Sequence, residues 1–274
     1  MAGADAVYLA GNRFGARAFS KNFSDEEIIK AINYCHLLGV KVYVTVNTLI
    51  YDNEVDNFLN YIEFIHKNNV DAIIIQDLGM FDLVRRTFPK LEIHASTQMH
   101  IHNLDGVKLM EDLGMRRVVL ARETSIDMIE EIKKNSQVEL EIFVHGALCI
   151  SYSGQCLMSS LIGGRSGNRG TCAGSCRLKY DVINNDGEKL NKGDYPLSTK
   201  DLNSLESIGK LIDIGVSSLK IEGRMKSKEY VYMVVSLYRE AIDSYYRCGK
   251  VSINNEKLVK LKKIFNRDYT KGFL

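Results

Sequence analysis

Residues 39–77, GVKVYVTVNTLIYDNEVDNFLNYIEFIHKNNVDAIIIQD, contain the pattern that decides the fold. Two runs rich in β-branched and other apolar residues, Lys41–Leu49 and Asp71–Asp77, are typical of strands. Between them, residues 53–68 repeat apolar side chains at helical spacing, as a core-facing helix requires. The apolar positions on this face are Val55, Phe58, Leu59, Ile62 and Ile65. The stretch therefore predicts a strand–helix–strand unit with two parallel strands.

The same alternation continues along most of the chain. Ser24-Asp25-Glu26-Glu27 predicts the capped start of a helix that ends at Gly39. Further strand-like runs are Asp5–Gly11, Glu92–Met99, Arg116–Arg122, Glu139–Gly146 and Ser217–Gly223. This α/β pattern favours one TIM-type (β/α) barrel domain over residues 1–274 rather than an open doubly wound sheet. Because a closed barrel needs eight strands and seven are visible, we expect the first strand and helix to lie upstream of Met1.

Residues 147–200 interrupt the alternation with a segment rich in glycine, serine and cysteine. A β-hairpin is expected in it, with Tyr180–Ile183 and Glu188–Leu190 flanking a turn at Asn184–Gly187. The segment follows the sixth visible strand, at the carboxyl end where barrel active sites are built. An insertion of this length in a compact barrel is usually functional, so we expect the site here.

Composition limits the kind of protein and its location. The net charge of +2 is too small to imply nucleic-acid binding by itself, so any basic surface must be local. No stretch is long and apolar enough to span a bilayer, and the first residues do not form a secretory signal. We therefore expect a cytoplasmic protein with no membrane contact. In that compartment clustered cysteines bind metal or do chemistry more often than they form disulfides.

Four of the six cysteines fall in the interrupting segment, spaced Cys149-x6-Cys156-x15-Cys172-x3-Cys176. Four thiolates in a glycine-rich loop can converge on one centre, and they suit tetrahedral zinc or an iron–sulfur cluster. Only the last spacing resembles a short zinc knuckle, so the wider ones favour a cluster. A role as small buried apolar side chains does not fit a polar loop. Cys35 and Cys248 lie in predicted helices without clustered partners, and we assign them to packing.

Polar residues also gather at the predicted carboxyl ends of strands. They are Asn47, Asp77, Gln98, Arg122, Glu123, His145, Glu222 and Arg224. Among them, Arg122 and Arg224 can clamp a dicarboxylate by bidentate pairing, with Gln98 facing the substrate. His145 or Glu222 can transfer protons if its surroundings adjust its pKa. For each residue singly, a packing role at the barrel mouth is an equal alternative.

A local basic collar surrounds the cysteines. Arg165, Arg169 and Arg177, together with Lys179, can contact RNA phosphates, although a solvated surface run of charge is the ordinary alternative.

Residues Glu141–Ser159, EIFVHGALCISYSGQCLMS, resemble the signature of the collagenase-like peptidases of unknown catalytic type, family thirty-two. Similar motifs follow at Gly164-Arg165, Asn168–Cys172, Cys176-Arg177 and Leu219–Ser227. The chain is most similar to the branch that hydroxylates the wobble uridine of tRNA. That resemblance implies a [4Fe-4S] cluster and prephenate as the hydroxyl donor. Related members modify ribosomal RNA or ubiquinone precursors. Longer members carry an extension beyond the position of Leu274.

The family name leaves peptidase activity as an alternative. The sequence contains neither a His-Glu-x-x-His zinc motif nor a Gly-x-Ser-x-Gly elbow. A Cys149–His145 nucleophile pair is conceivable, but it leaves three clustered cysteines unexplained. Cluster ligation uses all four, and the sequence therefore favours a redox RNA-modifying enzyme. A cluster-bearing or zinc-bearing RNA-binding scaffold without catalysis is the third hypothesis.

Overall fold

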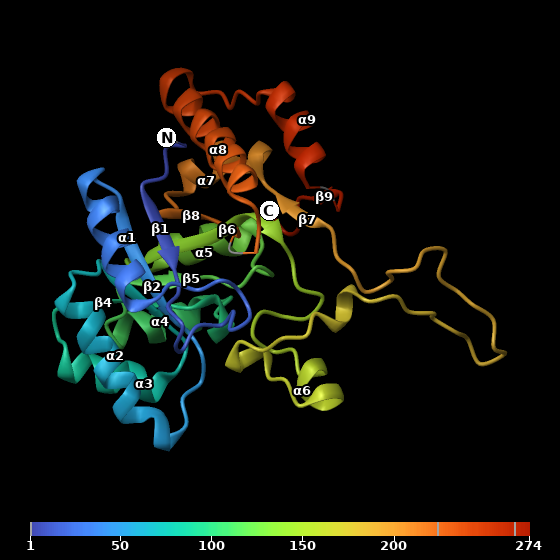
Figure 1. Ribbon diagram of the computed structural model, residues 1–274. Coiled ribbons are helices and arrows are strands. Elements are labelled where there is room, and N and C mark those ends of the chain that lie inside the picture. The colour runs from blue at the N-terminus through green and yellow to red at the C-terminus, as the bar shows by residue number, and fades with distance from the viewer. Residues whose placement is uncertain (1, 224, 266) are drawn as a thin grey trace.

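A computed structural model describes residues 2–223, 225–265 and 267–274 (Figure 1). Its sheet begins with strands that pair in parallel in chain order: β1 (Ala6–Leu9), β2 (Lys41–Val46), β3 (Ala72–Ile75), β4 (Glu92–Ala95), β5 (Arg117–Val119) and β6 (Glu139–Ala147). β8 (Ser218–Ile221) pairs in parallel with β6. β7 (Asp201–Asn203) is antiparallel to β6, and β9 (Tyr269–Thr270) is parallel to β7.

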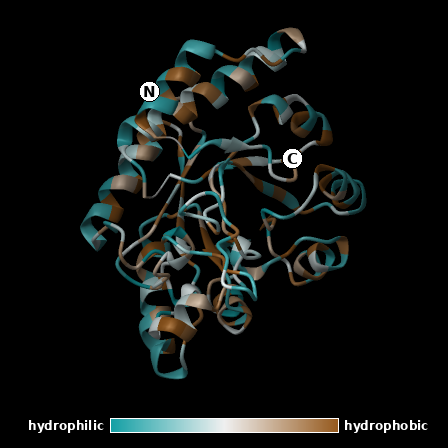
Figure 2. Cartoon of the chain, turned by 90° about the vertical axis from the view of Figure 1, so that its right-hand side faces the viewer, coloured by the Kyte–Doolittle hydropathy of each residue, from teal (hydrophilic) through white to brown (hydrophobic). Residues whose placement is uncertain are grey.

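The helices follow the strands as the pattern predicts. They are α1 (Asp25–Leu37), α2 (Val55–Lys67), α3 (Leu78–Thr87), α4 (Leu104–Asp112), α5 (Ile126–Asn135), α7 (Ile208–Ile214), α8 (Lys228–Cys248) and α9 (Asn255–Ile264). Figure 2 shows brown and teal residues alternating along them, as expected of helices with one apolar face. No helix in the described part of the chain is long and apolar enough to cross a bilayer.

Local signals in the sequence are confirmed where they are strongest. The hydroxyl of Ser24 accepts from the Glu27 N–H while the Glu27 carboxylate accepts from the Ser24 N–H, which is the predicted capping box of α1. In α2 the predicted side chains of Phe58, Ile62 and Ile65 are buried. Tyr61 is also buried there, although the spacing did not indicate it, whereas Val55 and Leu59 are only half-buried.

All seven predicted strands form, and six of them are shorter than the predicted run, whereas β6 extends one residue further, to Ala147. β7 and β9 were not predicted, because strands of three and two residues show no periodic pattern. The mostly parallel α/β sheet is confirmed, but barrel closure is not: among the described strands no ladder joins β8 to β1. Side-chain contacts do cross between them: the Tyr8 hydroxyl donates to the Ile221 carbonyl at 3.4 Å, and Lys220 Nζ lies 4.5 Å from the centroid of the Tyr8 ring.

The segment between β6 and β7 contains a short helix, α6 (Met158–Gly163), and two single turns, η3 (Gly167–Arg169) and η4 (Ser175–Arg177). The predicted hairpin follows, with Ile183 bridged to Lys189 and the Leu190 N–H donating to the Val182 carbonyl at 2.7 Å. In Figure 1 the hairpin extends away from the sheet.

The two faces of the sheet differ in polarity. The outer face packs apolar side chains such as Val42 and Val44 into the main core beneath the helices. The inner face buries charge: Lys220 Nζ lies 2.6 Å from Glu141 Oε1, and Arg117 lies 3.3 Å from the other oxygen of Glu141. Burial opposes ionisation of Glu141, but these cations prevail and lower the pKa of its carboxyl to about 2.

We predict that Glu141→Gln lowers the free energy of unfolding at pH 7 by about 3 kcal/mol, because it leaves Lys220 buried without its counter-charge. Since the folded-state pKa of Glu141 is depressed, its contribution is present above about pH 4.5 and is lost as the pH falls towards about 2. Urea unfolding at several pH values measures both effects. Glu130→Gln, which removes an exposed partner of Lys134, is the control and should change little. Equal stability of the two variants would contradict a structural role for the buried pair.

Candidate active site

A pocket of about 150 Å³ lies where the carboxyl ends of the parallel strands meet the cysteine-rich segment, residues 147–177. Strand ends contribute Asn47, Gln98, Arg122 and Glu222 to its lining. The cysteine-rich segment contributes Cys149, Cys156 and Cys172. The structure thus brings together four of the eight predicted polar strand ends and three of the four clustered thiols.

Two glycines seat the cysteine-rich segment on the strand ends. Gly154 has φ +76°, and a β-carbon there would lie 2.2 Å from the backbone oxygen of Gln98, in the turn η2 (Thr97–Met99). Gly170 has φ +77°, and its β-carbon would lie 2.5 Å from the Gly15 carbonyl oxygen. Only glycine permits both this backbone conformation and this approach, so these contacts fix the height of the segment above the pocket.

Hydrogen bonds also hold the cysteine-rich segment against the ends of the strands. The Asn168 carbonyl accepts from the Leu49 N–H at 3.2 Å and from Gln76 Nε2 at 3.0 Å. The Ser153 hydroxyl donates to Glu123 Oε1 at 3.3 Å. Because these partners follow β2, β3 and β5, the segment spans the mouth of the curled sheet.

The four thiols act on one another. Burial, and then the charges of the other three cysteines, raise the pKa of Cys176, while the neighbouring Arg177 lowers it. The Gly174 N–H donates to Cys172 Sγ at 3.4 Å. All four are free thiols. Four thiols in one segment are a suitable ligand set for a cationic centre, although no three candidate ligands among the described residues are arranged to hold a metal ion as they stand.

Arg122 and Glu222 form a pair in the pocket wall. Arg122 Nη2 lies 3.4 Å from Glu222 Oε2, and its guanidinium stacks on the Phe143 ring at 3.8 Å. Burial lowers the pKa of Arg122, the charge of Glu222 raises it, and the charge of Arg17 lowers it further. Gly146 supports this wall, because a β-carbon at its φ of +111° would lie 2.9 Å from the β-carbon of Glu222.

Arg17 and Lys220 also line the pocket, and sequence reasoning missed both. Arg17 lies in the irregular loop between β1 and α1, where no periodic pattern marks it. Lys220 had a usable signal, since it stands two residues before Glu222 and strand alternation turns both to the same face. With Arg122 they give the lining more positive than negative side chains, as an anionic ligand requires.

His145 does not join this pocket. A β-bulge shifts the pairing of β6 with β8 between Phe143 and His145, so Phe143 lines the pocket and His145 is turned to the opposite face. There it is 1% exposed, with its Nδ1 atom 3.3 Å from the Tyr238 hydroxyl. Burial, and then the charge of Lys226, lower the pKa of His145 to about 3. The imidazole is therefore neutral. The catalytic role of His145 stays a prediction, because its side chain does not line the pocket.

The predicted RNA-binding arginines differ in their availability. Arg165 is exposed and donates to the Thr171 carbonyl at 2.9 Å. Arg169 makes two contacts of 2.7 Å with the carboxylate of Glu54. Arg177 is half-buried and braces the cysteine-rich segment by donating to Ser198 Oγ and the Thr199 carbonyl, both at 2.8 Å. Arg224, predicted as a substrate clamp, lies outside the described residues.

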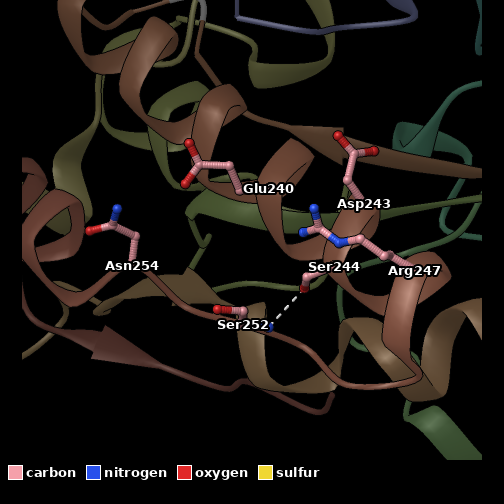
Figure 3. A pocket seen from close by; sticks show the side chains of 6 residues that line it. All are labelled: Glu240, Asp243, Ser244, Arg247, Ser252 and Asn254. Carbon is pink, nitrogen blue, oxygen red and sulfur yellow. Dashed lines mark hydrogen bonds between the residues drawn. The ribbon is translucent and has the colours of Figure 1, made fainter.

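A larger cavity of about 450 Å³ lies beside α8, lined by Glu240, Asp243, Ser244, Arg247, Ser252 and Asn254 (Figure 3). The Ser244 hydroxyl accepts from the Ser252 N–H at 2.8 Å. Its acids are already paired, Glu240 with Lys257 and Asp243 with Arg239. We therefore place the candidate site at the strand ends.

A mostly parallel α/β sheet with a polar, thiol-lined pocket at its carboxyl ends defines a class of proteins whose function lies in the loops at that face. The chain belongs to peptidase family U32, whose family model matches residues 1–274. A solved structure of a U32 peptidase has the same fold, with a TM-score of 0.55 at 11% identity over 83% of this chain and 88% of that one.

Curated relatives carry names of two kinds. The chain is 41% identical to "tRNA hydroxylation protein P1" of Bacillus subtilis (strain 168), over 99% of this chain and 66% of that protein. It is 40% identical to a 23S rRNA 5-hydroxycytidine synthase of Escherichia coli (strain K12), over 88% of this chain and 36% of that protein. It is also 36% identical to "Collagenase" of Porphyromonas gingivalis (strain ATCC BAA-308 / W83), over 99% of this chain and 69% of that protein. The chain thus spans less than two thirds of each of the first two relatives.

We predict that Gly154→Ala loosens the cysteine-rich segment, because a β-carbon 2.2 Å from the Gln98 oxygen forces the two backbones apart. Labelling of Cys149, Cys156, Cys172 and Cys176 by a thiol reagent should become several-fold faster. Gly187→Ala is the matched control, since Gly187 has φ +83° with no atom within 4 Å of the added carbon. If both variants label at the wild-type rate, Gly154 does not hold the cysteine-rich segment in place.

Proposed function

We propose that this chain carries the active site of an RNA hydroxylase of family U32 that 5-hydroxylates the wobble uridine of tRNA. The observation that carries the proposal is a pocket lined by three of the clustered thiols, with Cys176 within reach of their charges, and by Arg17, Arg122 and Lys220. Relatives named for tRNA hydroxylation and for 5-hydroxycytidine synthesis support this reaction class. We further infer that the curled sheet is a single TIM-type barrel, open between β1 and β8, and that the protein acts in the cytoplasm.

In this proposal Cys149, Cys156, Cys172 and Cys176 hold a [4Fe-4S] cluster, with zinc as the alternative occupant. When bound, the cluster supplies the electron-transfer chemistry that hydroxylation without molecular oxygen needs. The protein holds its ligands on a segment seated by Gly154 and Gly170, which keeps the thiols over the pocket. Arg177 braces the same segment by donating to the Thr199 carbonyl, and its charge partly offsets the burial that raises the pKa of Cys176.

The remaining pocket residues bind and orient the ligands. Arg122, held flat by Phe143, presents its guanidinium for bidentate pairing with a carboxylate of the hydroxyl donor, which we propose to be prephenate. Arg17 offers a second charge, and Gln98 an amide, in the same wall. Glu222 is the group placed to hold or move a proton, because its carboxylate faces this pocket. Exposed Arg165 is the candidate contact for an RNA phosphate.

Peptidase activity is the second candidate, because a relative named collagenase covers 99% of the chain. The geometry argues against a Cys149–His145 pair, since Cys149 lines the pocket whereas His145 is buried on the opposite face. We therefore rank hydrolysis below hydroxylation.

Anaerobic purification tests the cluster. We expect about four iron and four sulfide per chain, with the absorption and EPR spectra of a [4Fe-4S] centre. Cys172→Ser and Cys176→Ser should lower the iron content severalfold, because each removes a ligand. Cys35→Ser, half-buried in α1, should leave it unchanged. Stoichiometric zinc with no iron would overturn the redox proposal.

Mass spectrometry of tRNA tests the substrate. A strain without the gene should lose the hydroxyl group of wobble uridine, and the wild-type gene should restore it. Arg122→Lys should restore it at least about tenfold less well, because an ammonium cannot pair in a bidentate manner. Arg247→Lys, in the other cavity, is the control. Unchanged wobble uridine in the deletion strain would exclude this substrate, and gelatin hydrolysis that survives Cys172→Ser and Cys176→Ser would favour a peptidase.

A further inference from the structure

A second group of buried polar side chains lies behind β6, on the face opposite the pocket. Among the buried polar atoms of the described residues that have no hydrogen-bond partner, five belong to this group: His145 Nε2, Asp201 Oδ2, Ser204 Oγ, Tyr230 Oη and Tyr269 Oη. His145, Asp201, Ser204 and Tyr230 are each at most 1% exposed. Buried polar groups are almost always paired, so five together require a shared explanation.

These side chains adjoin one another although they come from β6, β7, β9, α8 and the turn after β7. The His145 ring lies 5.5 Å from the Tyr269 ring and 6.1 Å from the Tyr230 ring, between centroids. Burial is the main cause that raises the pKa of Tyr230 and of Tyr269, and the charge of Asp201 is the second cause for both. The Asp201 carboxylate therefore lies near both hydroxyls. The Ser204 N–H points at the Tyr238 hydroxyl at 3.1 Å, beside His145.

The hydrogen bonds of Tyr238 determine the tautomer of His145. Tyr238 gives its one hydroxyl proton to the Val144 carbonyl at 2.7 Å. Its oxygen can therefore only accept from His145 Nδ1, which lies 3.3 Å away. In the neutral imidazole the proton is then on Nδ1, and Nε2 presents a bare lone pair to the cluster.

The mixture of hydrogen-bond donors and acceptors in this cluster indicates which ligand it binds. A metal cation is disfavoured because Lys226 Nζ lies 3.8 Å from Asp201 Oδ2 and Arg267 lies 2.7 Å from Asp201 Oδ1. A simple anion is disfavoured because Asp201 Oδ2 and His145 Nε2 both present lone pairs. The three hydroxyls can each donate or accept. Water satisfies donors and acceptors together, usually with about three hydrogen bonds per molecule.

We propose that this cluster is a buried water-binding site, in which ordered water molecules bridge His145, Asp201, Ser204, Tyr230 and Tyr269 and hydrate the Lys226 ammonium. Phe265 closes the site beside Lys226, whose Nζ atom lies 2.8 Å from the centroid of its ring. The site backs directly onto the pocket, because the Glu222 N–H donates to the His145 carbonyl at 2.9 Å. It does not depend on the reaction proposed for that pocket.

The sign of a stability change tests the proposal. If water bridges the tyrosines, Tyr230→Phe and Tyr269→Phe each remove a satisfied hydrogen bond, and the thermal midpoint should fall by about 1–4 °C. If the cluster is dry, each variant removes an unsatisfied hydroxyl and the midpoint should rise, which overturns the proposal. Tyr232→Phe, 55% exposed on the same helix, is the control and should not move the midpoint.

Two measurements on the unaltered chain keep the test independent of variant folding. A high-resolution crystal structure should show water density within hydrogen-bond distance of Tyr230 Oη and His145 Nε2. Bromide or rubidium located there by anomalous scattering after soaking would instead assign an ion site and overturn the proposal. Nitrogen NMR should find His145 protonated on Nδ1, and a proton on Nε2 would contradict its assignment as an acceptor.

Discussion

The carboxylate of Glu141 stays ionised inside the curled sheet because three donors reach it: Lys220 at 2.6 Å, Ser218 at 2.8 Å and Arg117 at 3.3 Å. These donors come from β5 and β8, the two neighbours of β6 that run parallel to it. A charge at this depth is stable only if the three strands keep their relative register. The same register sets the positions of Phe143 and Glu222 above it, so the pocket wall depends on a buried charge pair whose Lys220 also lines the pocket.

The cysteine-rich segment depends on contacts of a different kind. It has little regular structure of its own, and Gly154, Gly170 and Asn168 attach it to the ends of strands. Loops positioned by a rigid scaffold commonly carry function, and here the scaffold brings three of the four thiols to the same pocket as three cationic side chains. This proximity favours a site in which a bound cofactor acts on an anionic ligand, rather than a site with a single cysteine nucleophile.

The sequence predicts the parts of this arrangement that follow from local chemistry. Alternation of β-branched runs with amphipathic stretches locates seven strands, the capping box locates α1, and cysteine spacing locates the thiols. It does not predict contacts between distant backbones, such as Gly154 with Gln98. Nor does it mark Arg17, which lies in a loop, or β7 and β9, which are too short for a period. His145 was interpreted as a strand-end group, but one extra residue in β6 turns it away from the pocket.

The bulge in β6 has a consequence for how such sites diverge. Side chains alternate between the faces of a strand, so two residues separated by one position share a face unless a bulge lies between them. Strand β6 therefore serves two separate compartments, with Phe143 in one and His145 in the other. Regular pairing of the same residues, without the bulge, would keep Phe143 and His145 on one face and would present the imidazole to the pocket without any change in side-chain chemistry. A shift of register between β6 and β8, rather than a substitution, is thus the simplest route by which a protein of this design could gain or lose a histidine beside its thiols.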